Sequence, residues 1–363
     1  MMRLQLASLL FGAAALAAPA QAEPTYETLS LALTDRVVIP AYERMVDAMA
    51  GLHEATDGFC RAPDADGLAT VTDAFHVAMD AWQRAQPVVL GPVTWDGRSA
   101  RIQFWPDKGG TGTRQIKRAL QGQDSALLAD GGLDGKSVAL QSLAAYERIV
   151  FGRGAAIASD QASDADRYAC GLAAAIARFQ AGLAAQILED WTKPGGYRAM
   201  VATAAAGNEY YVGAEEPAAE LLKSLTATLD MAIQLKLERP LGKSIDKARG
   251  KRTESWRSAR SRDNILANLD TAQALYTTPG GFGDMLIAAG AEPLDQGLRT
   301  GFQEAMETAR SIAPPLHTAI ADETQRPRVE ALLAQLKSLR LLIAGPVAEE
   351  IGLVVGFNAF DGD

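Results

Sequence analysis

The chain has 363 residues, of which 48% are hydrophobic, mostly Ala and Leu, and only 6% are aromatic. Its formal net charge is −9. This argues against binding to nucleic acid or to an anionic membrane surface, because both depend on Lys and Arg. Ala and Leu favour helices, and no useful stretch alternates polar and apolar residues, so we expect an all-α protein.

The first 22 residues have the layout of a secretory signal. Arg3 stands near the start, residues 4–16 form an apolar run, and Ala20 and Ala22 fit a small-x-small cleavage site. The run is too short to anchor the chain across a bilayer, and no cysteine follows it directly to take a lipid. We therefore expect cleavage near Glu23 and a soluble periplasmic protein without a membrane span.

The first half of the mature chain contains several segments with helical periodicity. Residues 25–56 are expected to form a helix with a bend at Pro40, since a proline inside a helix removes a hydrogen bond. A turn at 58–67, an amphipathic helix at 68–86, a long irregular connection at 87–112 and a short helix at 114–120 follow. The clearest helix covers 164–191. Connections as long as 87–112 are usually functional.

A change of composition at 195–217 marks a domain boundary. We expect one helical bundle at 23–212 and a second at 213–363, packed side by side. The second bundle should contain helices at 218–237, 257–276 and 294–312, and a last long helix that ends near Pro346. Residues 242–252, rich in Lys and Arg, are expected to form a solvated loop between two of these helices.

The sequence contains two cysteines, Cys60 and Cys170. An isolated pair in an oxidising periplasm favours a disulfide, which would tie the end of the first helical hairpin to the start of a long later helix. A metal site is the weaker alternative, because neither cysteine has another Cys or a His nearby.

Residues 141–152, QSLAAYERIVFG, place one carboxylate, Glu147, among apolar neighbours on a helix. A buried carboxylate must be paired, hydrogen-bonded or protonated. Glu147 is therefore either a structural residue that pairs with an arginine or caps a helix, or part of a binding site. The stretch resembles the signature of the imelysin-like family, Gly-x-His-x-x-Glu followed by an apolar run and a glycine. Here Ser142 replaces the glycine and Ala144 the histidine.

Three further segments are similar to the same family: VVIPAYERM at 37–45, QFWPDKGG at 103–110 and GFNAFDGD at 356–363. The resemblance therefore extends from the first mature helix to the last residue. It implies two packed helical bundles and a link to iron uptake. Because pockets between helices and domains are the usual binding sites, we expect the ligand in a groove between the two bundles.

The site residues implied by the resemblance are Ser142, Ala144 and Glu147, together with Trp105 and Asp107 in the long connection. A histidine three residues before the glutamate would share its helix face, and such a pair can hold a metal ion. With Ala144 in that place, iron or another divalent cation at Glu147 would need carboxylates from the second half. Alternatively, Trp105 plugs the end of the bundle and Glu147 is structural.

The three histidines are few and scattered. His76 and Asp80 lie four residues apart on one helix, with Asp73 before them, a geometry that can bind a cation. His53 and His317 are expected at the surface. The sequence has no His-Glu-x-x-His run, Cys-x-x-Cys-His haem motif, nucleophile elbow, P-loop or dinucleotide fingerprint.

Three functions agree with these observations. The first is a non-catalytic periplasmic binding or accessory protein whose ligand is iron, an iron complex or an iron-uptake partner protein. The second is a metallopeptidase, since the family name comes from a proteolytic activity. Hydrolysis needs a metal with an open position, or an activated nucleophile and a base, and no motif supplies them. The third is a helical interaction protein whose site has decayed, which Ser142 and Ala144 favour.

Overall fold

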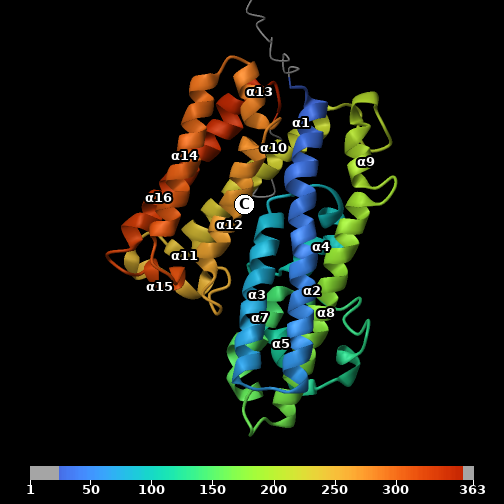
Figure 1. The fold of residues 1–363 in the computed structure, drawn as a ribbon. Coiled ribbons are helices and arrows are strands. Elements are labelled where there is room, and N and C mark those ends of the chain that lie inside the picture. Colours follow the sequence, from blue (N-terminus) through green and yellow to red (C-terminus); the bar gives the residue numbers. More distant parts are fainter. Residues whose placement is uncertain (1–23, 355–363) are drawn as a thin grey trace, which may run out of the picture.

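The computed structural model describes residues 24–354. The predicted signal and the segment 356–363 lie outside these residues. Within the described part every regular element is helical and no strand occurs, which confirms the all-α class. Figure 1 shows two sets of helices packed side by side, one from the first half of the chain and one from the second.

The first set is built around α2, which packs against both α3 and α8, while α7 packs against α8 and α3. Its helices are α1 (Tyr26–Leu33), α2 (Ile39–Arg61), α3 (Ala65–Ala85), α4 (Arg98–Ile102), α5 (Thr111–Gly122), α6 (Val138–Gln141), α7 (Leu143–Ile157), α8 (Asp164–Thr192) and α9 (Tyr197–Ala202).

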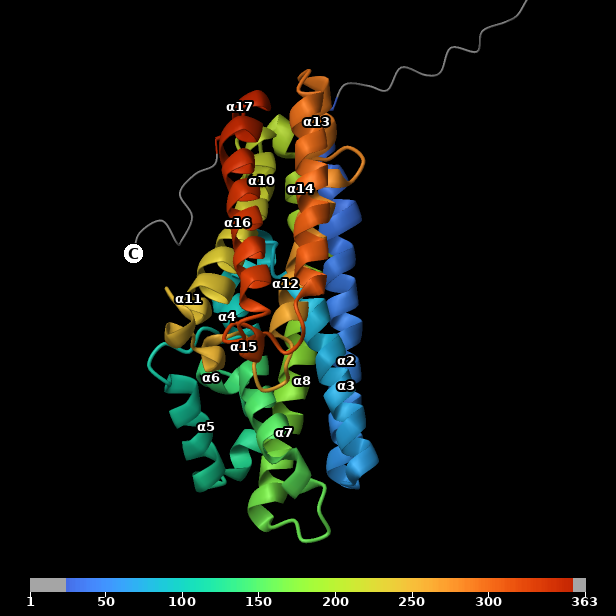
Figure 2. The same ribbon diagram turned by 90° about the vertical axis from the view of Figure 1, so that its left-hand side faces the viewer.

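The second set is built around α10, α12, α14 and α16, with α14 between α12 and α16 in the packing order. Figure 2 shows α14 and α16 lying side by side. Its helices are α10 (Glu215–Asp230), α11 (Arg239–Leu241), α12 (Ser261–Thr277), α13 (Phe282–Ala288), α14 (Glu292–Ser311), α15 (Leu316–Ala319), α16 (Arg326–Leu342) and α17 (Ala348–Glu350).

Contacts between α3 and α12 and between α1 and α10 join the two sets. The first helix of the chain thus reaches the second set, although its continuation, α2, belongs to the first. The division into two domains at residue 212 stays a prediction.

The helices bury the stripes that their periodicity predicts. On α3 and α8 the buried members are Val71, Phe75, Met79, Trp82, Leu172, Ile176, Leu183 and Ile187. Two stretches, Asp164–Ala202 and Arg326–Glu350, are long and apolar enough to cross a membrane by length and composition. Core helices of soluble proteins pass the same test, and here α8 packs against α2 and α7, and α16 against α14 and α10.

Pro40 lies inside a helix that continues from Tyr26 to Arg61, where we expected a bend. The chain forms a π-helical turn at Thr34–Val38, and Pro40 occupies the first turn of α2. Proline lacks the N–H for an α-helical bond and its ring crowds the carbonyl four residues earlier. A wider turn before it relieves both problems. A π-helical segment at Met231–Glu238 likewise precedes Pro240.

Two connections are shorter than we predicted. The predicted turn at 58–67 is too wide, since α2 extends to Arg61 and α3 begins at Ala65. Asp64 caps α3: its side chain accepts a hydrogen bond from the Gly67 amide at 2.7 Å. The connection at 87–112 contains a 3₁₀ segment, Gly91–Gly97, and the short α4. It is fixed to the bundle by an ion pair of 2.8 Å between Arg98 and Asp190.

A disulfide joins Cys60, near the end of α2, to Cys170 on α8. The two cysteines lie 110 residues apart in the sequence. The sequence-based prediction of a bridge between the first hairpin and the later long helix is therefore confirmed.

A buried ion pair in the second half is hydrogen-bonded to the first half. Lys236 Nζ lies 2.8 Å from Glu254 Oε2, and each side chain is only 1% exposed. Lys236 also donates to Gln83 on α3 and to Asn268 on α12, at 2.6 and 2.5 Å. Gln83 in turn donates to Glu254 at 3.2 Å. Burial lowers the pKa of Lys236, an effect that Glu254 opposes.

The disulfide should contribute substantially to stability. Closing a loop of this length lowers the entropy of the unfolded chain and is worth about 4 to 5 kcal/mol in the chain-entropy model. Reductant should therefore lower the melting temperature of the mature protein, measured by circular dichroism. The control is the double variant Cys60→Ala/Cys170→Ala. With or without reductant, it should melt at the same temperature as the wild type whose disulfide has been reduced. An unchanged melting temperature on verified reduction would contradict the prediction.

Replacing Lys236 by Met should lower the free energy of unfolding by roughly 3 to 5 kcal/mol, because Glu254 would stay buried without its cation. Chemical denaturation measures the loss. Lys337→Met is the matched control, since Lys337 pairs with Glu238 at 2.5 Å but both side chains are at least 40% exposed, and exposed pairs contribute at most about 1 kcal/mol. Equal losses in the two variants would be incompatible with this account.

Candidate functional site

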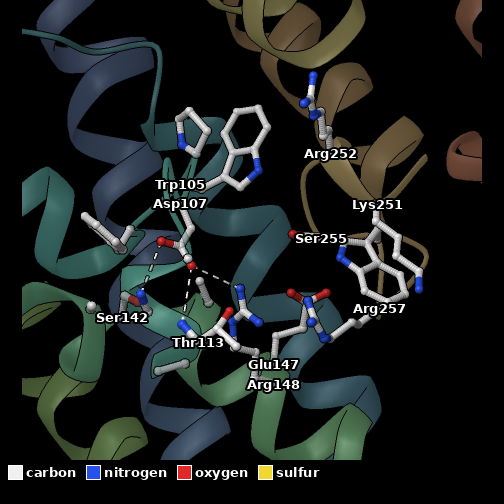
Figure 3. Close-up of a pocket in the computed structure, with 18 of the residues that line it drawn as sticks. Trp105, Asp107, Thr113, Ser142, Glu147, Arg148, Lys251, Arg252, Ser255 and Arg257 are labelled. Carbon is white, nitrogen blue, oxygen red and sulfur yellow. Dashed lines mark hydrogen bonds and ion pairs between the residues drawn. The ribbon is translucent and has the colours of Figure 1, made fainter. Parts of the chain in front are cut away.

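A pocket of about 190 Å³ lies where the two halves of the chain meet. All five residues implied by the sequence line it: Trp105, Asp107, Ser142, Ala144 and Glu147. The opposite wall comes from the segment between α11 and α12, including Lys251, Arg252, Ser255 and Arg257. Figure 3 shows the two groups of side chains facing one another.

Glu147 is only 5% exposed and forms part of the contact between the halves. Its Oε1 accepts hydrogen bonds from the backbone N–H of Ser258 at 2.9 Å and from the Ser258 hydroxyl at 2.8 Å. Burial raises the pKa of Glu147, while the Ser258 hydrogen bonds and the charges of Arg257 and Arg148 act in the opposite direction. The partner that our structural alternative required is therefore mainly a serine from the second half.

The Asp107 carboxylate also forms hydrogen bonds and an ion pair within the protein. Its carboxylate accepts from the backbone N–H groups of Gly112 and Thr113, at 3.2 and 3.3 Å, and thereby caps the start of α5. It also pairs with Arg148 at 3.3 Å. Figure 3 marks its bonds to Thr113 and Arg148. These contacts explain how the long connection is held beside α7.

The two altered motif positions both lie at the pocket. Ser142 precedes the first residue of α7, and its buried hydroxyl has no hydrogen-bond partner within the described residues. Ala144 is half-buried and lies three residues before Glu147 on the same helix. Since side chains three apart share a helix face, the small Ala144 leaves open the volume that a histidine would occupy.

The basic wall of the pocket was missed in the sequence. We expected a solvated loop at 242–252, and Lys251 and Arg252 are indeed exposed, but they also line the pocket. The Arg257 guanidinium lies 4.3 Å from the centre of the Trp256 ring, and Lys251 Nζ lies 5.5 Å from it. A tryptophan among basic residues was the signal that could have identified this wall.

The donor set does not fit a bare metal ion. No group of three or more His, Cys, Asp or Glu side chains that could hold one occurs within residues 24–354. Neither of the two carboxylates in the pocket is free of protein hydrogen bonds, and basic side chains surround them. The metal ion at Glu147 stays a prediction that this chemistry does not favour.

The second cation candidate is occupied by arginines. Asp80 pairs with Arg84 at 2.8 Å and with Arg260 at 3.2 Å. Burial and the charge of Arg260 both lower the pKa of His76. A metal ion at His76 and Asp80 would have to displace these arginines from the carboxylate.

The raised pKa of Glu147 predicts a pH effect. At pH values above the ordinary pKa of 4.5, Glu147 keeps its proton in the folded state but has released it in the unfolded state. The free energy of unfolding therefore falls as pH rises from 4.5 towards the raised pKa of the folded state. Glu147→Gln keeps an acceptor for Ser258 but cannot ionise. Between pH 4 and 7 the wild type should therefore lose stability relative to the variant, as measured by chemical denaturation.

Glu304→Gln, at an exposed position on α14, is the matched control for this comparison. A wild type that instead gains stability over Glu147→Gln between pH 4 and 7 would show that Arg148 and Arg257 outweigh burial.

Comparisons with known proteins agree with the architecture. A model of the imelysin family matches residues 38–343. The iron-regulated protein A of Synechococcus elongatus is 23% identical over 329 residues, which cover 87% of this chain and 83% of that protein.

Two crystal structures share the fold. An imelysin-like protein from Psychrobacter arcticum superposes with a TM-score of 0.75 and 19% identity, over 92% of this chain and 97% of that one. A putative iron-regulated protein A precursor from Parabacteroides distasonis gives a TM-score of 0.75 and 14% identity, over 91% and 97%. Because the family model covers most of its length, the chain belongs to the imelysin family.

Proposed function

We propose that this protein is a non-catalytic periplasmic binding or accessory protein in iron uptake, and that the pocket between its two halves is its binding site. The observation that carries the proposal is that all the residues implied by the family resemblance line one pocket, together with residues from the other half. Sites between domains and helices are the usual place for a ligand.

The link to iron rests on relatives. Two of them are described as iron-regulated protein A, and one of these as a precursor. A precursor is a form that is processed, which agrees with a signal at residues 1–22 of this chain. An iron-uptake protein that receives the ligand is the partner this function requires.

Peptidase activity is the weaker alternative because the pocket offers no hydrolytic machinery of a known kind. Neither histidine nor cysteine is among the lining residues. Ser258 hydrogen-bonds to Glu147 but is buried and is not one of the residues that line the cavity. Its hydroxyl therefore has no access to a substrate in this arrangement.

The experiment is iron accumulation in the native bacterium under iron limitation. Deletion of the gene should lower accumulation, and the wild-type gene should restore it. Ala144→Trp, which fills the pocket, should fail to restore it. Ala156→Trp, at an exposed position on the same helix, should restore it fully. Secretion and equal protein levels are checked by fractionating the periplasm.

Normal accumulation in the deletion strain would contradict a role in iron uptake. If deletion lowers accumulation and the Ala144→Trp gene restores it as fully as the wild-type gene does, the result would instead support an interaction protein whose site has decayed.

A further inference from the structure

We propose that the pocket binds a small polyanion with two or more carboxylate or phosphate groups, so that iron enters it as an anionic complex and not as a bare ion. This inference rests on the proposed function and specifies its ligand. The recognised chemistry is an array of oxyanion groups held by arginine and lysine.

The charge of the pocket is opposite to that of the chain. The whole sequence carries a formal charge of −9. The residues that line the pocket include two acidic side chains, Asp107 and Glu147, and five basic ones: Arg148, Arg239, Lys251, Arg252 and Arg257. A concave site with an excess of one sign of charge concentrates ligands of the opposite sign.

Within the described part of the chain, most of these basic groups have no acidic partner. Among residues 24–354, no carboxylate forms an ion pair with Arg239, Lys251, Arg252 or Arg257, and only Arg148 is paired. One guanidinium nitrogen of Arg239 is buried and has no hydrogen-bond partner within the same residues. A buried donor without a partner is costly, so an acceptor supplied by a ligand would stabilise it.

Two of the cations that line the pocket, Arg148 and Arg257, repel one another. Burial lowers the pKa of Arg257, and the nearby charge of Arg148 lowers it further. Glu147 offsets this only partly, because its own ionisation is disfavoured by burial. An anion placed between Arg148 and Arg257 would relieve the repulsion that the protein leaves in place.

The acidic residues do not compete with such a ligand. Asp107 is held by two backbone amides and Arg148, and Glu147 by Ser258. They hold the walls together, while the planar guanidinium groups of Arg252 and Arg257 remain available for bidentate bonds to carboxylate or phosphate. The cavity of about 190 Å³ is smaller than a typical pocket for a drug-sized ligand, so the anion must be compact.

Titration calorimetry on the mature full-length protein tests this inference. The probes are citrate, ferric citrate, pyrophosphate and ferrous iron without a chelator. At least one anion should bind saturably, and binding should weaken as salt is added. Arg257→Gln and Arg252→Gln should each weaken it about tenfold or more, since each removes a charged hydrogen bond. Arg310→Gln, exposed on α14 and outside the pocket, removes the same charge and should bind like the wild type.

The probes distinguish the sources of the anion. Binding of citrate with or without iron identifies a polycarboxylate, binding of ferric citrate alone identifies the iron complex, and binding of pyrophosphate alone identifies a ligand with several phosphate groups. The inference is overturned if no anion binds to folded protein, if Arg252→Gln and Arg257→Gln both bind like Arg310→Gln, or if unchelated iron alone binds and Glu147→Gln abolishes that binding.

Iron accumulation separates this inference from the proposed function. Accumulation that depends on the protein while no polyanion binds overturns the inference alone. Polyanion binding in a protein whose deletion leaves accumulation normal overturns the role in iron uptake alone.

Discussion

The junction of the two halves depends on the buried ion pair between Lys236 and Glu254 of the second half and on its hydrogen bonds to α3 of the first. Both charges are removed from water, a cost that only well-placed partners offset. Those partners come from both sides: Gln83 lies on α3 of the first set, and Asn268 on α12 of the second. Because the network is satisfied only when the helices lie in this arrangement, it fixes their relative position as well as holding them together.

The pocket is a consequence of this junction. Glu254 is followed directly by Ser255, which lines the pocket, and then by Arg257 and Ser258. Because Lys236 fixes the position of Glu254, the residues that follow lie against the first half, where the Ser258 hydroxyl donates to Glu147. The basic wall of the pocket and the contact between Ser258 and Glu147 therefore belong to one short segment, and a change in the buried pair would alter both.

Sequence reasoning identified the helices, the disulfide and one side of the pocket, because each leaves a local or chemical pattern. Apolar periodicity marked α3 and α8, and the motif marked Glu147. It did not identify the basic wall. The tryptophan among basic residues at 251–257 was a local signal for a site, but no local pattern shows that this segment lies against α7, more than a hundred residues earlier in the chain. For the same reason Lys236 went unnoticed, because a lone lysine in an apolar helix reveals its partner only in three dimensions. A proline inside a helical pattern predicts only a bend or a break, so the π-helical turn before Pro40 could not be predicted either.

The altered motif and the basic wall point to the same conclusion about the ligand. Where the family signature has a histidine able to bind a metal, Ala144 leaves open volume, and arginines surround it. The most direct test is a crystal structure of the mature protein with ferric citrate, in which anomalous scattering locates the iron. We expect the organic anion in the pocket against Arg252 and Arg257, with iron bound by the oxygens of the anion. Iron coordinated by Glu147 without an organic anion, or a complex bound elsewhere on the protein, would contradict the account.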